Sequence, residues 1–198
     1  MHKQFDEKKF NLGELKGISQ KTKEEHLKLY AGYVKHTNLI LKKIEELTED
    51  SEKNAYALGE IQRRFSFEYN GMRNHEIYFD SLSDGPSELG GNSKLKKIIA
   101  ETWGSFEVWL LRFKAIAMTR GIGWAMLYRD NKCGRLLNAW VDEQHLGQLQ
   151  NCTLLLGLDM WEHSFVADYQ PSGKKQYVED FFTSLNWSKI EKNFDGSK

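Results

Sequence analysis

Two long stretches of helical periodicity near the N-terminus constrain the fold more than any other feature of the sequence. The first runs from about Lys21 to Glu46, and Gly32 is the only Gly or Pro within it. The second runs from about Asn54 to Leu82. Apolar side chains recur in both at the spacing of an amphipathic helix. These positions are Leu29, Tyr33, Ile40, Ile44, Leu58, Ile61, Phe65 and Tyr69. Two such helices in succession predict a long antiparallel helical hairpin.

A segment rich in turn-forming residues, SDGPSELGGNS at 83–93, separates this hairpin from a second half of different character. The residue pattern of that half predicts one helix, a β-hairpin, a buried strand and two closing helices. The ranges are 94–118 for the helix, 123–129 and 135–141 for the hairpin strands, 153–158 for the buried strand, and 174–185 and 187–194 for the closing helices. We therefore predict an α+β fold with an N-terminal helical-hairpin domain (1–84). A C-terminal α/β domain (93–198) should contain a small three-stranded antiparallel sheet.

The charge balance excludes several classes of partner. Lys plus Arg and Asp plus Glu number 28 each, so no net charge attracts nucleic acid or an anionic membrane. No apolar run approaches the length of a membrane span, and the polar start MHKQFDEKKF does not resemble a secretory signal. Cys133 and Cys152 form no CxxC pair and are expected to be free thiols. These features predict a cytoplasmic protein that binds neither nucleic acid nor membrane.

The most specific feature for chemistry is a carboxylate at a predicted strand end. Asp159 follows the buried strand, and His163 comes four residues later. A buried carboxylate is costly unless something neutralises its charge. A metal ion would do so, and so would an arginine, a helix N-terminus or exposure to solvent. The spacing alone leaves these alternatives open.

Two more histidines lie on the predicted hairpin helices. His26 shares a helical face with Tyr33, and His75 lies in the second helix beside aromatic residues. A lone histidine in either place is more often structural than a metal ligand. Together with Asp159 and His163, however, the pair would supply three imidazoles and one carboxylate, which suits iron or manganese. Composition and spacing cannot show that the four side chains converge.

Several sequence elements follow one another in an order that is typical of one known family. The strongest is Asp159-x-Trp161-Glu162-His163, within GLDMWEHSF. The others are the run from His26 to Tyr33, the pair Asn74-His75 preceded by Gly71, the segment Gly121-Ile122-Gly123-Trp124, and Tyr177 with the closing FFTSLNW. With these elements the chain resembles the iron/manganese superoxide dismutases over nearly its whole length.

The resemblance implies an enzyme that converts superoxide into oxygen and hydrogen peroxide at one iron or manganese ion per chain. In the family the metal lies between a helical hairpin and an α/β half. The implied metal ligands are His26, His75, Asp159 and His163. The implied partner is a second copy of the chain in a homodimer, with a tetramer as the alternative.

Roles for the surrounding residues also follow from the resemblance. Tyr33 matches the gateway tyrosine of the substrate funnel, and Trp124 and Trp161 match the apolar wall around the metal. Glu162 matches a residue that reaches His163 of the partner subunit. Such a contact orients the ring and tunes its basicity.

A glutamine or histidine normally hydrogen-bonds the metal-bound solvent in this family. Gly71 stands where some iron enzymes carry that glutamine, so the residue should come from the stretch 142–145. We prefer His145, because some family members place a histidine shortly before the last strand. Gln144 is the alternative, and a solvent-exposed His145 is the bland interpretation.

Two departures from the family pattern affect these expectations. His26 and Tyr33 are seven residues apart, one fewer than usual, which suits an unbroken helix. An alignment without a gap would make Glu25 the ligand in place of His26. A polar pair common in the family is also replaced, since Val166 stands at one of its positions.

Two other functions stay open at this point. A different non-haem iron enzyme would use two histidines and one carboxylate, so one of the three histidines would be dispensable for metal binding. A catalytically inert protein on the same scaffold would hold no stoichiometric metal. The intact ligand set argues against the inert protein.

Overall fold

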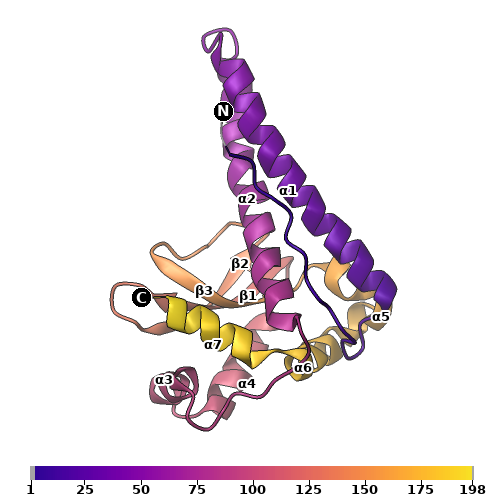
Figure 1. Ribbon diagram of the computed structural model, residues 1–198, viewed down its shortest axis with the longest axis vertical. Coiled ribbons are helices and arrows are strands. Elements are labelled where there is room, and N and C mark those ends of the chain that lie inside the picture. Colours follow the sequence, from indigo (N-terminus) through magenta and orange to yellow (C-terminus); the bar gives the residue numbers. More distant parts are fainter. Residues whose placement is uncertain (1–2, 198) are drawn as a thin grey trace.

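The computed structural model describes residues 3–197 and has two parts (Figure 1). A long helical hairpin, formed by α1 (Gln20–Thr48) and α2 (Ala55–Leu82), projects from a broader lower half. The lower half contains α3 (Lys94–Trp103), α4 (Phe106–Ala117), β1 (Gly123–Asp130), β2 (Leu136–Asp142), β3 (Cys152–Asp159), a 3-10 helix η1 (Glu162–Ser164), α5 (Val166–Tyr169), a second 3-10 helix η2 (Pro171–Gly173), α6 (Lys174–Ser184) and α7 (Trp187–Gly196). The predicted α+β architecture is confirmed.

The first hairpin helix is continuous from a capped start. Ser19 caps α1, because its side chain accepts a hydrogen bond from the backbone N–H of Thr22 at 3.2 Å. No bulge interrupts the α-helix between His26 and Tyr33, as their seven-residue spacing predicts. None of the helices within residues 3–197 combines the length and apolar character that crossing a bilayer requires.

The segment predicted as one helix at 94–118 is two helices, so that prediction was wrong. Gly104 ends α3 with φ of +93°, a conformation that favours glycine. Ser105 then caps α4, because its side chain accepts from the backbone N–H of Val108 at 3.2 Å. The apolar pattern runs through this break, which is why periodicity alone did not reveal it.

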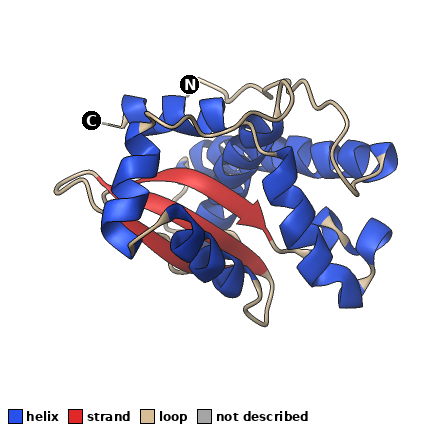
Figure 2. Cartoon of the chain, turned by 90° about the horizontal axis from the view of Figure 1, so that it is seen from below, coloured by secondary structure: helices blue, strands red, loops and turns tan. Residues whose placement is uncertain are grey.

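The sheet has the strand order β2-β1-β3, and both pairings are antiparallel. Helices lie in front of and behind the strands, so the sheet is enclosed between them (Figure 2). Central strand β1 places Trp124 opposite Val141 of β2 and opposite Asp159 of β3. All three of these residues are fully buried, which sets the end of β3 deep in the core.

An extended N-terminal arm, residues 3–19, runs along the hairpin down to the lower half (Figure 1). Phe10 packs edge-on against Tyr30 of α1, with ring centroids 5.7 Å apart. Farther along, Lys16 forms an ion pair with Asp180 of α6 at 2.9 Å. The arm therefore joins both parts of the molecule.

Candidate metal centre

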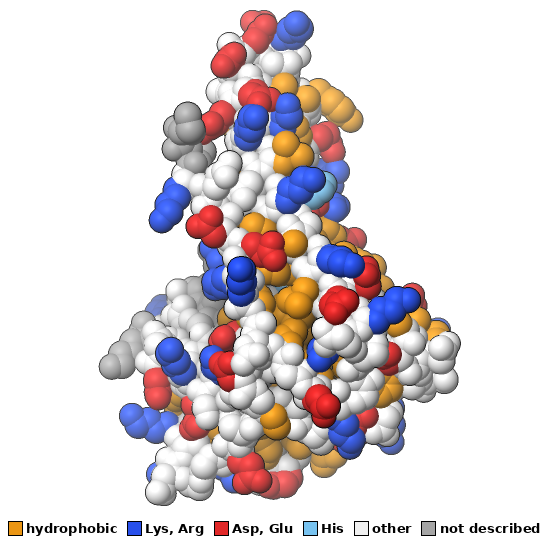
Figure 3. Space-filling model, turned by 45° about the vertical axis from the view of Figure 1, so that its right-hand side comes forward, with side chains coloured by type: hydrophobic (Ala, Val, Ile, Leu, Met, Phe, Trp, Pro, Cys, Tyr) orange, Lys and Arg blue, Asp and Glu red, His pale blue; other side chains and the backbone are white. Residues whose placement is uncertain are grey.

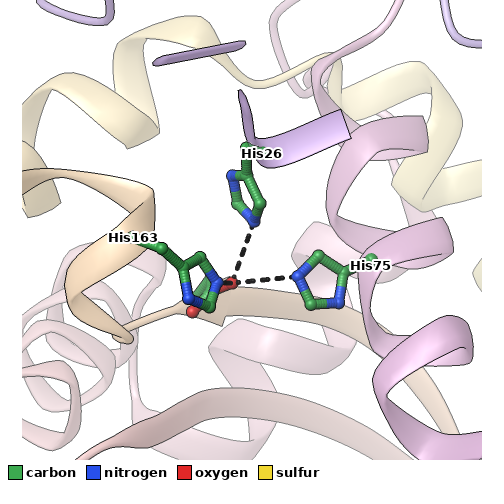
Figure 4. A group of neighbouring side chains, drawn as sticks. His26, His75 and His163 are labelled. Carbon is green, nitrogen blue, oxygen red and sulfur yellow. Dashed lines mark hydrogen bonds and ion pairs between the residues drawn. The ribbon is translucent and has the colours of Figure 1, made fainter. Parts of the chain in front are cut away.

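Three imidazoles and one carboxylate meet where the hairpin joins the lower half (Figure 4). His26 comes from α1, His75 from α2 and His163 from η1, while Asp159 is the last residue of β3. One nitrogen or oxygen of each side chain lies within 4.8 Å of the corresponding atoms of the other three. The structure brings together all four residues that the sequence singled out.

The three rings direct Nε2 at a single carboxylate oxygen. Nε2 of His26 and of His163 each lie 3.1 Å from Oδ2 of Asp159, and Nε2 of His75 lies 3.5 Å from it. His26 is 3% exposed, and His75 and Asp159 are fully buried, but the His163 side chain is 26% exposed. The cluster is therefore closed on the hairpin side and accessible beside His163.

The end of β3 holds Asp159 through several hydrogen bonds. Its Oδ1 accepts from the backbone N–H of Trp161 at 2.8 Å, and its main-chain carbonyl accepts from the hydroxyls of Ser164 and Tyr177 at 3.0 and 2.9 Å. Burial opposes ionisation, but the electrostatic interaction with His163 and hydrogen bonds from the His163 and His26 imidazoles outweigh it. They hold the pKa of Asp159 below its usual range, so the group is an anion at neutral pH.

His75 directs an unprotonated nitrogen at this anion. Its Nδ1 lies 2.6 Å from the carbonyl oxygen of Gly71, which can only accept, so Nδ1 carries the proton. Burial lowers the pKa of His75 to about 3, so the ring is neutral and Nε2 keeps its lone pair. Within residues 3–197 this buried Nε2 has no hydrogen-bond partner. A lone pair and a carboxylate oxygen repel each other unless a cation lies between them, and the residues therefore fit a metal ion.

On α1, the structure places His26 in the cluster and Glu25 outside it. Burial lowers the pKa of His26, so its ring is a neutral base suited to metal ligation. Glu25 is exposed and pairs with Lys28 at 2.8 Å. The choice of His26 over Glu25 thus agrees with the geometry.

Tyr33 and Gln144 form a hydrogen-bonded pair beside the cluster. Gln144 Nε2 donates to the hydroxyl of Tyr33 at 3.0 Å, and Gln144 Oε1 accepts from the indole N–H of Trp124 at 3.0 Å. The rings of Tyr33 and Trp124 each lie 5.1 Å from the ring of His75. Gln144 is fully buried, so its amide is fixed between two groups that contact a cluster histidine.

His145, preferred over Gln144 from the sequence, points elsewhere. Its side chain is 20% exposed and packs edge-on against Phe67, with ring centroids 5.7 Å apart. Its Nδ1 lies 4.0 Å from a carboxylate oxygen of Glu143. The geometry therefore favours Gln144 for the role that we had assigned to His145.

Gly71 makes room for Tyr33. A Cβ atom at this position would lie 2.5 Å from Cδ1 of the Tyr33 ring, closer than real contacts allow. A glutamine at residue 71 would therefore displace Tyr33. This agrees with the expectation that the hydrogen-bonding amide comes from the second half of the chain.

The two tryptophans and Glu162 lie on different sides of the cluster. Trp124 is fully buried behind His75, whereas Trp161 is half-buried and stacks on His163 with ring centroids 5.7 Å apart. Glu162 is exposed, and its carboxylate makes no hydrogen bond or ion pair within the described part of the chain. The open side of the centre thus carries an uncompensated carboxylate.

Sequence reasoning missed two residues at the edge of the site. Phe67 contacts Tyr33 and Trp161, with ring centroids 6.0 and 6.4 Å away. The guanidinium of Arg64 lies over Phe67 at 3.7 Å and pairs with Glu68 at 2.9 Å. Helical spacing from Tyr33 does not reveal them, because they belong to the opposite helix.

Comparison with known proteins agrees with this geometry. A sequence model for the alpha-hairpin domain of iron/manganese superoxide dismutases matches residues 9–83, and one for their C-terminal domain matches residues 91–193. The chain belongs to the iron/manganese superoxide dismutase family. Its relatives include superoxide dismutase [Fe] of Cupriavidus metallidurans, which is 35% identical over 91% of this chain and 90% of its own length. Superoxide dismutase [Mn] of Mycobacterium avium is 34% identical over 85% of this chain and 80% of its own.

Proposed function

We propose that the chain carries out superoxide dismutation at one iron or manganese ion held by His26, His75, Asp159 and His163. The observation that carries this assignment is the His75 lone pair, which lies 3.5 Å from a carboxylate oxygen and has no hydrogen-bond partner among residues 3–197. Family membership favours this activity over an inert or differently reactive metal protein. The reaction is 2 O2•− + 2 H+ → O2 + H2O2.

When bound, iron or manganese supplies one-electron chemistry by alternating between the +3 and +2 states. The chain's own contribution begins with charge. Three neutral imidazoles and one carboxylate would cancel only one unit of the metal's +2 or +3 charge, so the loaded centre would stay net positive, which favours an anionic substrate. Trp124 packs at about a right angle against His75, and Trp161 stacks on His163, so both rings have apolar neighbours. The tight cluster therefore combines a positive centre with an apolar wall.

Tyr33 and Gln144 are proposed to manage protons beside the metal. Because the Gln144 amide donates to the Tyr33 oxygen, the phenol proton is free to point toward substrate. Burial first, and then the charge of Asp159, raise the pKa of Tyr33, so its hydroxyl keeps this proton at neutral pH. We give Gln144, rather than His145, the role of hydrogen-bonding a solvent molecule that a bound metal would carry.

The test is elemental analysis of the purified protein combined with a superoxide-decay assay. We expect one iron or manganese ion per chain, and activity that is lost on metal removal and restored by reloading. The variant His75→Gln should lose both metal and activity, while exposed His36→Gln should keep both. Stoichiometric metal without accelerated superoxide decay would favour the differently reactive alternative. Full metal retention in the His75→Gln variant would show that His75 is not a metal ligand.

We also propose a homodimer formed through the open side of the centre. Figure 3 shows apolar side chains gathered where the hairpin meets the lower half. Ile122 and Leu146 are 44% and 51% exposed, and both lie next to the loop of Glu143, whose carbonyl accepts from the Trp161 indole at 3.1 Å. The exposed carboxylate of Glu162 borders the same region, and it suits a contact with His163 of the partner subunit.

Light scattering measures this directly, with an expected mass of twice the 23.1 kDa of the chain. Leu146→Lys should shift the mass toward that of one chain. Leu111→Lys, on the exposed face of α4, is the control and should not. An unchanged mass for Leu146→Lys would place the interface elsewhere, and four chain masses would indicate a tetramer.

A cytoplasmic location is proposed from the cysteines. Cys133 is exposed and Cys152 half-buried, and both are free thiols. Exposed thiols persist where the surroundings are reducing. Fractionation of the source cells, with activity staining of each fraction, tests this proposal.

A further inference from the structure

The backbone that carries Gln144 is strained and needs support. Glu143, directly before it, has φ of +50°, which is unfavourable for a residue with a side chain. Its N–H donates to the carbonyl of Ile122 at 3.0 Å, and its carbonyl accepts from the Trp161 indole at 3.1 Å. These contacts fix the loop before Gln144. Other side chains must hold the loop on the far side of Gln144.

Three side chains on the opposite side of Gln144 do so. Asn74 Nδ2 donates to the main-chain carbonyl of Gln144 at 2.9 Å. Gln148 Nε2 donates to Oδ1 of Asn74 at 3.0 Å and also approaches the Gln144 carbonyl at 3.3 Å. The hydroxyl of Tyr128 donates to Oε1 of Gln148, which sets the orientation of the Gln148 amide. All the donors point toward Gln144, so the arrangement is directional.

This network connects the site to distant elements. Asn74 directly precedes the cluster residue His75 on α2, and Tyr128 belongs to central strand β1. Asn74 is 1% exposed and Tyr128 is 2% exposed, so neither has an alternative partner in bulk water. Losing the Gln148 amide leaves the buried Oδ1 of Asn74 without its donor, and the strained loop can then relax.

We propose that Gln148, oriented by Tyr128, is a positioning residue that holds Gln144 against Tyr33 and Trp124. The inference rests on the proposed function of Gln144, which it extends to residues that touch neither substrate nor metal. Groups beyond the ligands of a metal commonly change its affinity or activity by 10–100-fold. An amide displaced by a fraction of an ångström would no longer reach both the Tyr33 hydroxyl and the indole N–H.

The test compares three variant holoenzymes with the wild type. Gln148→Met keeps the side-chain volume and removes the amide. Tyr128→Phe keeps the ring and removes only the hydroxyl, so it should fold even if the first variant does not. Gln150→Met is the control, because Gln150 is exposed in the same turn region. Each protein is measured for metal content, for kcat and KM in superoxide decay, and for the visible absorption of its oxidised metal.

We expect Gln148→Met to lower kcat about tenfold at unchanged metal content, with a smaller change in KM and a shifted absorption band. Tyr128→Phe should act in the same direction by about threefold, and Gln150→Met should match the wild type. Crystal structures should show the Gln144 amide displaced from the Trp124 indole in the first two variants.

An unmoved Gln144 with unchanged kcat per metal would overturn the proposal. So would activity that falls only in proportion to metal content. If the metal-loaded wild type does not accelerate superoxide decay, the proposed function fails instead. The position of Gln144 in the variant crystals still tests the positioning role in that case.

Discussion

The two halves of the molecule contribute to the metal centre in different ways. The hairpin supplies His26 and His75 from within regular helices, whose geometry sets the direction of both side chains. Burial lowers the pKa of each ring and so keeps it neutral. The lower half supplies Asp159, His163 and Gln144 from a strand end, a 3-10 helix and a strained loop. Those groups depend on dense local hydrogen bonding. Helix geometry is thus enough to place a neutral ligand, whereas a buried anion needs a dedicated scaffold.

The largest effect is expected from replacing the carboxylate that the lower half supplies to the centre. Asp159→Asn keeps the shape but removes the charge toward which three imidazoles converge. Activity should fall by more than about a hundredfold, since groups one step farther from a metal already cost 10–100-fold. Metal content and superoxide decay are the measurements, and Asp195→Asn at an exposed site is the control. Normal metal content in Asp159→Asn would show that the three histidines hold the metal without the carboxylate.

The acid sensitivity of the metal-free chain should come mainly from the hairpin. Because the pKa of His75 is lowered to about 3, the unfolded imidazole takes up a proton below its ordinary pKa of about 6.5, and the folded one does not. The free energy of unfolding should therefore decrease as the pH falls from about 6.5 to 4, by up to about 1.4 kcal/mol per pH unit for each such group.

Asp159 acts in a lower range, because its lowered pKa makes stability fall only as the pH drops below the ordinary carboxylate value. Urea denaturation at several pH values should thus give a flatter profile for His75→Gln than for the wild type. Parallel profiles would assign the acid sensitivity to other groups.

A smaller effect is expected from crowding the hairpin next to the site. Gly71→Ala puts a Cβ 2.5 Å from the Tyr33 ring, which should cost about 1–3 kcal/mol of stability and displace Tyr33 from Gln144. Gly59→Ala is the matched control in the same helix, since nothing lies within 4 Å of the added atom. It should stabilise the chain by about 0.5–1 kcal/mol. Chemical denaturation and kcat measurements distinguish the two variants. Equal effects of Gly71→Ala and Gly59→Ala would contradict the close approach of residue 71 to the Tyr33 ring.

The smallest effect concerns Arg64 at the mouth of the site. Arg64→Gln removes a positive charge that neighbours Tyr33 through Phe67, but Glu68 already neutralises part of it. We expect kcat/KM to fall about twofold at low salt and by less at high salt, because screening weakens steering. A decrease that is independent of ionic strength would indicate a packing role.

Sequence patterns predicted the helix-borne part of the site better than the loop-borne part. The spacing of His26 and Tyr33 predicts a shared face, and the motif around Asp159 is specific. No pattern decides between Gln144 and His145, because the positive φ of Glu143 determines which side chain turns inward. The helix break at Gly104 was missed for a similar reason, since a backbone angle rather than a hydrophobic period sets it.

The N-terminal arm has a consequence for biosynthesis. Its Lys16 pairs with Asp180, yet the ribosome synthesises Lys16 long before Asp180. At roughly 5–20 residues per second, the nascent arm waits about ten seconds or more for its docking site. The helical hairpin can form during that interval, but the N-terminal arm docks onto the lower half only when translation is nearly complete.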